Sequence, residues 1–424
     1  MDTIANPTVI APPGARRIID VPGDLADYRA SGGYSPITAP ADLLDQVVAA
    51  GLRGRGGAGF PMGTKLRSVI AHSGPGVRPV VVANGEEGEP ASAKDRWLLR
   101  HRPHLVLDGL RLAAAILDAD RAVVYLSDPA VAEAVTAAIG EAGPMAVPFE
   151  LHTVAAGYVA GEETAAVRSL NGGEAKPMDK PPRPFSRGVG GRPTLISNVE
   201  TLANLAWIHR HGAEAFRAAG TAESPGTFLA TVTGAGRDAA IYELPHGFSL
   251  RELLALHGVA DDLVHGALLG GYFNGLTGRR VLDLTLDHET LRAAGTGLGC
   301  GAVALLTEPD CPVAVTASVL EYFDRENAGQ CGSCFNGIAA MSAVASALRD
   351  GTAAPADLER FDRWSTVLRG RGACATLDAA TNAARTLLDE FPDAVKRHRD
   401  GGCATCATTP FTALRPFDVE TVTV

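Results

Sequence analysis

Glycine-rich loops are the first feature of this 424-residue chain that could carry chemistry. One loop holds Gly54, Gly56, Gly57 and Gly59 and is followed by Lys65. Glycines allow positive φ and a close approach to the backbone, and backbone N–H groups beside a helix start favour phosphate. The spacing matches neither a P-loop nor a dinucleotide fingerprint. The loop is therefore either a phosphate cradle of another kind or a flexible connection.

Two acidic segments could hydrogen-bond a nucleotide. Asn84, Glu86 and Glu87 follow a short β-branched run, at the sheet edge where open α/β sheets bind ligands, and suit a flavin or ribose edge. Gly161-Glu162-Glu163 suits ribose hydroxyls or a nicotinamide. The alternatives are an acidic turn for the first segment and an acidic first helical turn for the second. Lys180 either reaches a phosphate or is an ordinary surface lysine.

All seven cysteines lie in the last third of the chain, which disfavours a disulfide framework in a chain without an export signal. Cys331 and Cys334 form a CxxC turn that can present two thiolates to one metal, and Cys374 could add a third. Buried free thiols or a redox CxxC are the alternatives. Cys403 and Cys406 form a second CxxC in the tail.

Hydrophobic periodicity predicts the elements that position these residues. A run at 79–83 predicts a buried strand, and runs at 122–126 and 149–154 predict two further strands. A helix opens at Ala39-Pro40-Ala41-Asp42 and runs into the glycine-rich loop, and residues 96–117 and 129–139 also have helical spacing. Strands that alternate with helices predict a parallel sheet. Residues 227–285, with a strand at 227–233 and a helix at 250–257, predict a compact α+β module. Four helices follow from residue 313, one with Ile338, Met341, Val344, Ala345 and Leu348 on one face.

Composition excludes several classes of protein. Apolar residues make up 46% and charged residues 20% of the chain, which argues against disorder. The net charge of −10 and the lack of a basic domain argue against nucleic-acid binding. No apolar run approaches a membrane span, and Met1-Asp2-Thr3-Ile4 shows no signal pattern. We therefore expect a cytoplasmic protein without direct membrane insertion, free or peripheral to a membrane complex.

Taken together, these blocks resemble the family of the NADH-binding flavoprotein subunit of respiratory complex I, with relatives in NAD-linked formate dehydrogenases and hydrogenases. The carriers are GLRGRGGAGFPMGTK (51–65), NGEEGEPASAKDR (84–96), YVAGEETAAVRSL (158–170), KPP (180–182), GRPTLISNVET (191–201), and CGSC (331–334) with GACATLDAA (372–380). The implied fold is α/β: a Rossmann-like parallel-sheet flavin domain, a small β-grasp-like module and a C-terminal four-helix bundle. The expected boundaries are an extended N-terminal arm (1–40), an FMN/NADH-binding domain (41–222), the β-grasp-like module (223–310), the bundle with iron–sulfur ligands (311–397) and a cysteine-containing tail (398–424).

The resemblance implies cofactors and residue roles. FMN would be held by the Gly54–Gly59 loop and Lys65, by Asn84 and Glu86, and by Ser197, Asn198 and Thr201. NADH would stack on the flavin beside Phe60, with Glu87, Glu162, Glu163 and Lys180 nearby; Gly161 lies in the same block. Phe60 and Glu163 are the expected catalytic residues.

The chain departs from the family pattern at five places. It has Glu86 for aspartate, Leu66 for an aromatic residue, Arg183 for phenylalanine, and Ser197-Asn198 for two asparagines. Ala328 stands where the family has the first cysteine of its cluster motif, which leaves Cys331, Cys334 and Cys374 of four ligand positions. The family's cluster is [4Fe–4S]. Here a three-iron cluster, a fourth ligand borrowed from Cys403, Cys406, a water or a partner residue, and no cluster remain open.

The expected function is an NADH dehydrogenase (diaphorase) module. It would pass a hydride from NADH to FMN and then electrons to an iron–sulfur cluster or an acceptor protein, with a thioredoxin-like [2Fe–2S] subunit or a ferredoxin as partner. The alternatives are a cluster-free flavin reductase that serves a soluble acceptor, and a non-catalytic subunit that retains the fold.

Overall fold

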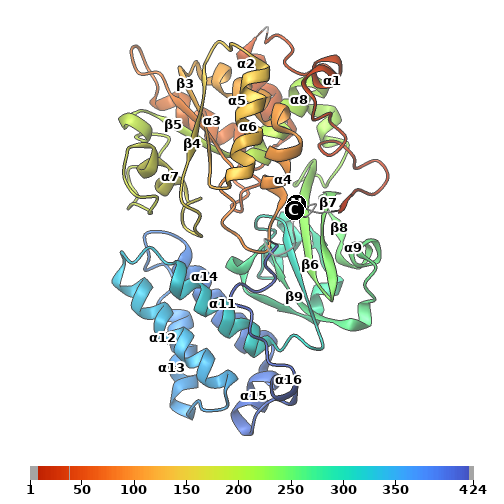
Figure 1. The fold of residues 1–424 in the computed structure, drawn as a ribbon, viewed down its shortest axis with the longest axis vertical. Helices are drawn as coiled ribbons and strands as arrows, with labels where there is room; N and C mark the ends of the chain where they lie inside the picture. Colours follow the sequence, from red (N-terminus) through yellow and green to blue (C-terminus); the bar gives the residue numbers. More distant parts are fainter. Residues whose placement is uncertain (1–7, 38, 420–424) are drawn as a thin grey trace.

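The computed structural model describes residues 8–37 and 39–419. Figure 1 shows three regions along the long axis: a helix-covered sheet at one end, a second sheet in the middle and a group of helices at the other end. The segment Met1–Ile4, which shows no signal pattern, lies outside the described residues.

The first region is built on a four-stranded parallel sheet in the order β4-β3-β2-β5. The strands are β2 (Val80–Asn84), β3 (Arg121–Leu126), β4 (Phe149–Thr153) and β5 (Thr194–Asn198). Alternate side chains of β2 enter different cores: Val81 packs with the main helical layer, whereas Val80 and Val82 pack toward the opposite face. Burial on both faces explains why β2 and β3 are almost wholly apolar.

Helices cover both faces of this sheet. They are α2 (Pro40–Ala50), α3 (Met62–His72), α4 (Lys94–His101), α5 (Pro103–Leu117), α6 (Pro129–Ala142), α7 (Glu163–Leu170) and α8 (Val199–Arg217), and η1 (Val189–Gly191) is a single 3₁₀ turn. The single helix expected over 96–117 is wrong. Arg102 has non-helical dihedrals, because it precedes Pro103, which begins α5.

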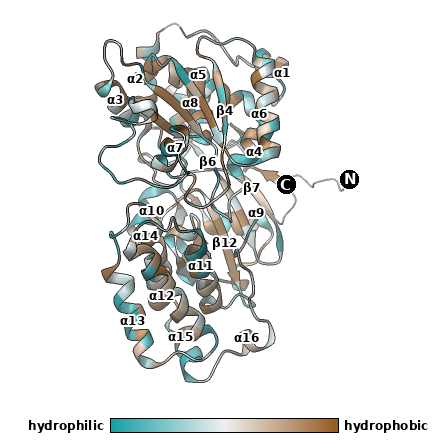
Figure 2. Ribbon diagram, turned by 60° about the vertical axis from the view of Figure 1, so that its left-hand side comes forward, coloured by the Kyte–Doolittle hydropathy of each residue, from teal (hydrophilic) through white to brown (hydrophobic). Residues whose placement is uncertain are grey.

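The second sheet has six strands in the order β1-β7-β6-β12-β9-β10. They are β1 (Thr8–Ile10), β6 (Thr227–Gly234), β7 (Arg237–Pro245), β9 (Val264–Leu269), β10 (Leu276–Gly278) and β12 (Ala302–Thr307), with a small pair β8 (Phe248–Ser249) and β11 (Thr285–Leu286) beside them. Strand β12 divides its side chains between two cores: Val303 packs with α9 (Leu250–His257) and Ala304 packs with the C-terminal helices. The apolar interior strands are visible in Figure 2.

Further short helical elements lie between the strands of this second sheet region. They are η2 (Asp261–Leu263), η3 (Tyr272–Asn274), η4 (Arg279–Asp283) and α10 (His288–Ala293). The C-terminal helices are α11 (Pro312–Glu326), α12 (Gly332–Arg349), α13 (Pro355–Val367), α14 (Thr376–Glu390), α15 (Pro392–Asp400) and α16 (Ala404–Thr408). The predicted apolar face of α12 is buried from Ile338 to Leu348.

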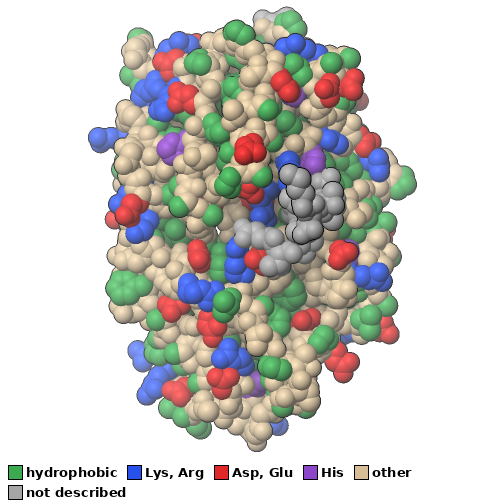
Figure 3. Space-filling model, in the orientation of Figure 1, with side chains coloured by type: hydrophobic (Ala, Val, Ile, Leu, Met, Phe, Trp, Pro, Cys, Tyr) green, Lys and Arg blue, Asp and Glu red, His purple; other side chains and the backbone are tan. Residues whose placement is uncertain are grey.

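No helix among residues 8–37 and 39–419 is long and apolar enough to cross a membrane. On the face shown in Figure 3, positively and negatively charged side chains are interspersed.

The structure adds two short elements to the arm expected over residues 1–40: β1 and α1 (Leu25–Ala30). The buried carboxylate of Glu243 on β7 fixes the segment between them. It accepts hydrogen bonds from the backbone N–H groups of Arg17, Ile18 and Ile19 and from the hydroxyl of Thr227. The arm is thereby attached to the middle sheet.

We expect Glu243→Ala to lower the free energy of unfolding by roughly 2–5 kcal/mol, because each buried N–H without an acceptor costs about 1–3 kcal/mol. A fall in melting temperature measures it. The matched control is Asp238→Ala, which removes an exposed carboxylate from the same strand and should change the melting temperature little. Equal shifts for both variants would contradict this role of Glu243.

Candidate functional site

The glycine-rich loop between α2 and α3 is a closed structure. The N–H of Gly54 donates to the carbonyl of Phe60 at 2.9 Å, and the N–H of Met62 donates to the carbonyl of Leu52 at 2.8 Å. Gly57 has φ +119°, which L side chains rarely adopt, and no other atom lies near the place of a Cβ on it. These backbone bonds exclude a merely flexible connection, and the glycine leaves open space beside the loop.

A buried ion cluster of Arg55, Lys94, Asp95 and Glu200 supports this loop. The Lys94 ammonium lies 2.6 Å from Asp95 and 2.9 Å from Glu200, and the Arg55 guanidinium lies 3.7 Å from Glu200. The two positive and two negative groups balance in charge. Burial raises the pKa of the Asp95 carboxyl, although Lys94 opposes that shift. The sequence alone did not reveal this cluster, because charged residues in a helix are usually exposed.

Three predicted flavin ligands make contacts that shape the loop and the helix that follows β5, and their contact with a flavin stays a prediction. Asn198 caps α8 by accepting from the N–H of Glu200 at 2.9 Å, and its amide donates to Asp95 at 2.6 Å. The hydroxyl of Thr201 accepts from the N–H of Arg55 at 2.9 Å. Ser197 is buried, with its hydroxyl 3.8 Å from the sulfur of Met62. Their side chains hold neighbouring elements in place.

The carboxyl ends of β2 and β5 bring the acidic segment to the same edge. Asn84 pairs with Asn198 in the strand register, and its amide donates to the carbonyl of Gly161 at 2.8 Å. The Glu86 carboxylate is buried: one oxygen lies 3.4 Å from the N–H of Gly157, and no described residue donates to the other in hydrogen-bond geometry. Burial raises the pKa of Glu86. Glu86 therefore has an oxygen that a ligand could satisfy.

Glu87 has a different environment from Glu86. Its carboxylate accepts from the backbone N–H groups of Asp95 and Arg96 at 3.1 and 3.0 Å and from the hydroxyl of Ser92 at 2.6 Å. These bonds fix the start of α4. A contact between Glu87 and NADH stays a prediction.

Two carboxylates and two lysines face one another beside the loop. Lys180 Nζ lies 2.6 Å from Glu162 and 3.6 Å from Glu163, and Lys65 Nζ lies 3.7 Å from Glu163. Burial lowers the pKa of Lys65 more than its carboxylate neighbours raise it. For Lys180 burial also lowers the pKa, but the hydrogen bonds and charges of Glu162 and Glu163 together outweigh burial, so the pKa is raised.

Glu162 and Glu163 have different roles in this group. Glu162 caps α7, accepting from the N–H groups of Thr164 and Ala165, as the helix-turn alternative expected. Among the described residues, the Glu163 carboxylate forms ion pairs only with Lys65 and Lys180. Glu163 is therefore the carboxylate with the most freedom to bind a ligand.

The Phe60 ring, which is 51% exposed, lies at the end of the glycine-rich loop.

The three cysteines predicted as metal ligands come together at one end of the helical region. Cys331 is the residue before α12 and Cys334 lies in the first turn of α12, while Cys374 lies two residues before the first residue of α14. The N–H of Ala373 lies 3.4 Å from the sulfur of Cys331. Burial, together with the neighbouring thiols, raises the pKa of Cys334 to about 12. Ala328 lies in the loop before Cys331.

The tail cysteines do not supply the fourth ligand there. Cys403 and Cys406 lie with Cys311 and His398. The loan of a tail cysteine to Cys331, Cys334 and Cys374 is therefore wrong. The second CxxC, with His398 five residues before Cys403, was the signal in the sequence for this other group, whereas Cys311 is 87 residues before His398 and has no spacing relation to them.

Comparison with known proteins identifies the family. Residues 47–207 match the Nuo51 FMN-binding domain, and residues 314–398 match the iron–sulfur binding region of NADH-ubiquinone oxidoreductase-F. The chain is 33% identical over 401 residues to the F 2 subunit of NADH-quinone oxidoreductase from Rhizobium meliloti, a match that covers 88% of this chain and 94% of that protein. The chain belongs to the family of the F subunit of NADH-quinone oxidoreductase. It is an FMN-dependent NADH oxidoreductase subunit with an FMN-binding domain and an iron–sulfur binding region.

Relatives outside complex I agree. The chain is 31% identical over 421 residues to HndC of the NADP-reducing hydrogenase from Solidesulfovibrio fructosivorans, a match that covers 94% of this chain and 85% of that protein. The crystal structure of an air-oxidised NAD+-reducing [NiFe]-hydrogenase superposes with a TM-score of 0.83 and 28% identity, over 97% of this chain and 72% of that one. The resemblance found in the sequence is confirmed.

The residues of the site fit FMN. Backbone N–H groups at the start of α3 and the ammonium of Lys65 suit a phosphate. The open space beside Gly57 leaves room for a ligand against the backbone, and the buried oxygen of Glu86 suits an N–H or hydroxyl donor. The site thus offers polar groups for both ends of a flavin nucleotide: N–H groups and Lys65 for the phosphate, and Glu86 for a donor at the other end.

Gly57→Val should reduce FMN retention at least about tenfold, or ~1.4 kcal/mol, because a branched side chain would fill the space beside the loop and strain its backbone. Flavin absorbance after gel filtration measures it. Gly76→Val is the matched control, since Gly76 also has positive φ (+80°) and open space at its Cβ position but lies outside the loop. Full retention of FMN by Gly57→Val would show that this loop does not hold the flavin.

Proposed function

We propose that the edge of the parallel sheet binds FMN and NADH side by side, and that the chain passes electrons from NADH toward an acceptor protein. The observation that carries this is the convergence of the glycine-rich loop, Glu86 and the Glu163 group on one edge. When bound, FMN accepts a hydride from NADH and releases electrons singly.

Each residue has a distinct part in this proposal. Lys65 and the loop N–H groups hold the phosphate, and Glu86 receives a hydrogen bond from the flavin. Glu163 orients NADH from its position between Lys65 and Lys180. Phe60 offers an exposed aromatic face on which a nicotinamide or adenine ring can stack. Asn198, Thr201 and the buried ion cluster keep the loop in position.

The three thiolates of Cys331, Cys334 and Cys374 are proposed to hold iron as part of an iron–sulfur cluster with only three protein ligands. Their common location at the starts of α12 and α14 supports this, because thiolates from two helices can meet at one cluster. With alanine at 328, iron at this site should be labile. This proposal disfavours the cluster-free reductase, and the complete loop and acidic segments disfavour a non-catalytic subunit.

A [2Fe–2S] subunit of thioredoxin-like fold, or a ferredoxin, is the proposed acceptor, and the protein is proposed to act in the cytoplasm, free or peripheral to a membrane complex. The second sheet with α9 is proposed to be a β-grasp-like module, and α11–α14 a four-helix bundle, within the boundaries expected from the sequence.

Glu163→Gln should lower kcat/KM for NADH about tenfold or more, because a charged hydrogen bond is worth roughly 1.5–3 kcal/mol, while FMN content stays unchanged. Steady-state NADH oxidation with an artificial acceptor measures it. The matched control is Glu174→Gln, which neutralises an exposed carboxylate paired with Lys176. Unchanged turnover in Glu163→Gln would remove this carboxylate from the NADH site.

Ala328→Cys should raise the iron content from at most about three toward about four per chain and slow its loss in air, because it restores a fourth thiolate. Iron and acid-labile sulfide after anaerobic reconstitution measure it. Ala328→Ser, similar in size but without a thiolate, is the control. If the native chain takes up no iron and Ala328→Cys changes nothing, the cluster assignment fails and the flavin reductase remains.

A further inference from the structure

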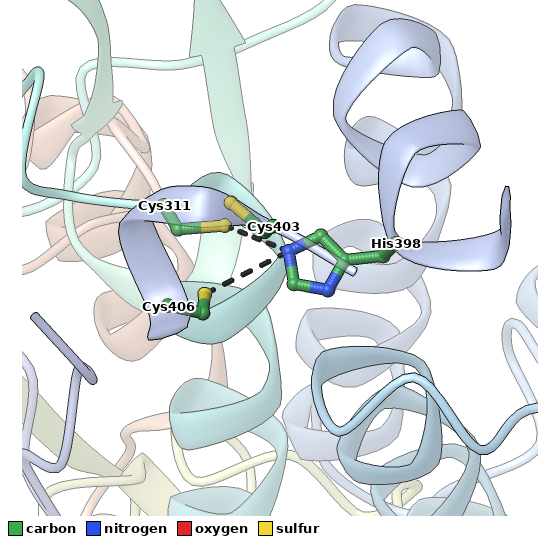
Figure 4. Close-up of side chains that lie close together, drawn as sticks. All are labelled: Cys311, His398, Cys403 and Cys406. Carbon is green, nitrogen blue, oxygen red and sulfur yellow. Dashed lines mark hydrogen bonds between the residues drawn. The ribbon is translucent and has the colours of Figure 1, made fainter. Parts of the chain in front are cut away.

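A second group of metal-binding side chains lies at the far end of the helical region. Cys311 is the residue before α11 and His398 belongs to α15. Cys403 is the residue before α16, and Cys406 lies in the first turn of α16. Their ligand atoms all lie within 4.8 Å of one another. Figure 4 shows the three sulfur atoms and one imidazole nitrogen directed toward a common point.

The imidazole of His398 is oriented as metal-binding histidines are. Its Nδ1 lies 3.1 Å from the carbonyl oxygens of both Leu348 and Arg349, so it carries the proton and donates it to the end of α12. Nε2 is therefore left with a free lone pair, and it faces the sulfurs of Cys311 at 3.2 Å and Cys406 at 3.7 Å. A backbone acceptor behind the ring fixes the tautomer that a metal requires.

The spacing of the four ligand atoms distinguishes a single zinc ion from a four-iron cluster. Zinc binds thiolate sulfur at about 2.3 Å and imidazole nitrogen at about 2.0–2.1 Å in a tetrahedron, which brings the four ligand atoms within about 4 Å of each other. In a four-iron cluster each ligand binds a different iron, which spreads the ligand atoms wider. We propose that Cys311, His398, Cys403 and Cys406 bind one structural zinc ion.

This site is separate from the one proposed for iron. Cys331 directly precedes the beginning of α12, whereas His398 contacts the carbonyls of Leu348 and Arg349 at its end. A helical rise of about 1.5 Å per residue places these ends roughly 25 Å apart. The zinc proposal therefore does not depend on whether Cys331, Cys334 and Cys374 hold iron.

The ion would attach the C-terminal segment to the helices. Beyond Cys406 the chain returns toward the first region: Arg325 donates to the carbonyl of Leu414 at 2.6 Å, and the N–H of Val419 donates to the carbonyl of Pro90 at 3.0 Å. Pro90 ends the acidic segment that contains Glu86. A zinc ion at the turn would fix the start of this return path.

Elemental analysis of the purified full-length protein tests the proposal. We expect one zinc per chain, lost at least tenfold in Cys406→Ser and in His398→Ala, with FMN and iron contents unchanged. Thr405→Ser, between the two tail cysteines, is the matched control and should keep its zinc. Cys334→Ser should lose iron and retain zinc, whereas Cys406→Ser should lose zinc and retain iron.

Cobalt substitution keeps the test decisive if a variant fails to fold. The native chain, with its metal removed and replaced by Co²⁺, should show the intense visible bands of tetrahedral thiolate coordination. A native chain that contains no zinc and takes up no Co²⁺, iron in place of zinc at these four residues, or full zinc in Cys406→Ser would each overturn the proposal.

Discussion

The buried ammonium of Lys94 is the constraint on which the rest of the site depends. It lies between Asp95 and Glu200, and these carboxylates also contact Asn198 and Arg55. The four charges come from the glycine-rich loop, α4 and α8, and Glu200 also accepts from the N–H of Leu229 on β6 at 2.9 Å. Removal of one partner from such a buried set costs about 3–5 kcal/mol. The loop, the parallel sheet and the middle sheet are thus held in one arrangement.

The arrangement divides the polar residues of the site into two groups. Asn198, Thr201 and Glu87 accept hydrogen bonds from backbone N–H groups, so they shape the pocket. Among the described residues, no backbone N–H group donates to Oε2 of Glu86 or to the Glu163 carboxylate, which faces Lys65 and Lys180. This difference is the physical basis for assigning ligand contacts to the second group, and sequence similarity alone treats both groups alike.

Local pattern predicted much of the fold. The three predicted strands correspond to β2, β3 and β4, and the apolar face of α12 is buried as expected. Strand β5 and the order of the six-stranded sheet were missed, because non-local pairing leaves little trace in spacing. Pro103 divides a segment whose periodicity looked continuous. The group around His398 needed three dimensions, since Cys311 is 87 residues away from it along the chain.

The central claim is that one sheet edge brings NADH and FMN together. The most direct measurement is anaerobic titration of the FMN-loaded protein with NADH, followed by the visible absorbance of the flavin. We predict that the flavin absorbance falls in proportion to the NADH added, in a time no longer than one catalytic turnover takes. Addition of an acceptor should restore the absorbance. Bound FMN that stays oxidised in excess NADH, yet is bleached by a chemical reductant, would contradict the account.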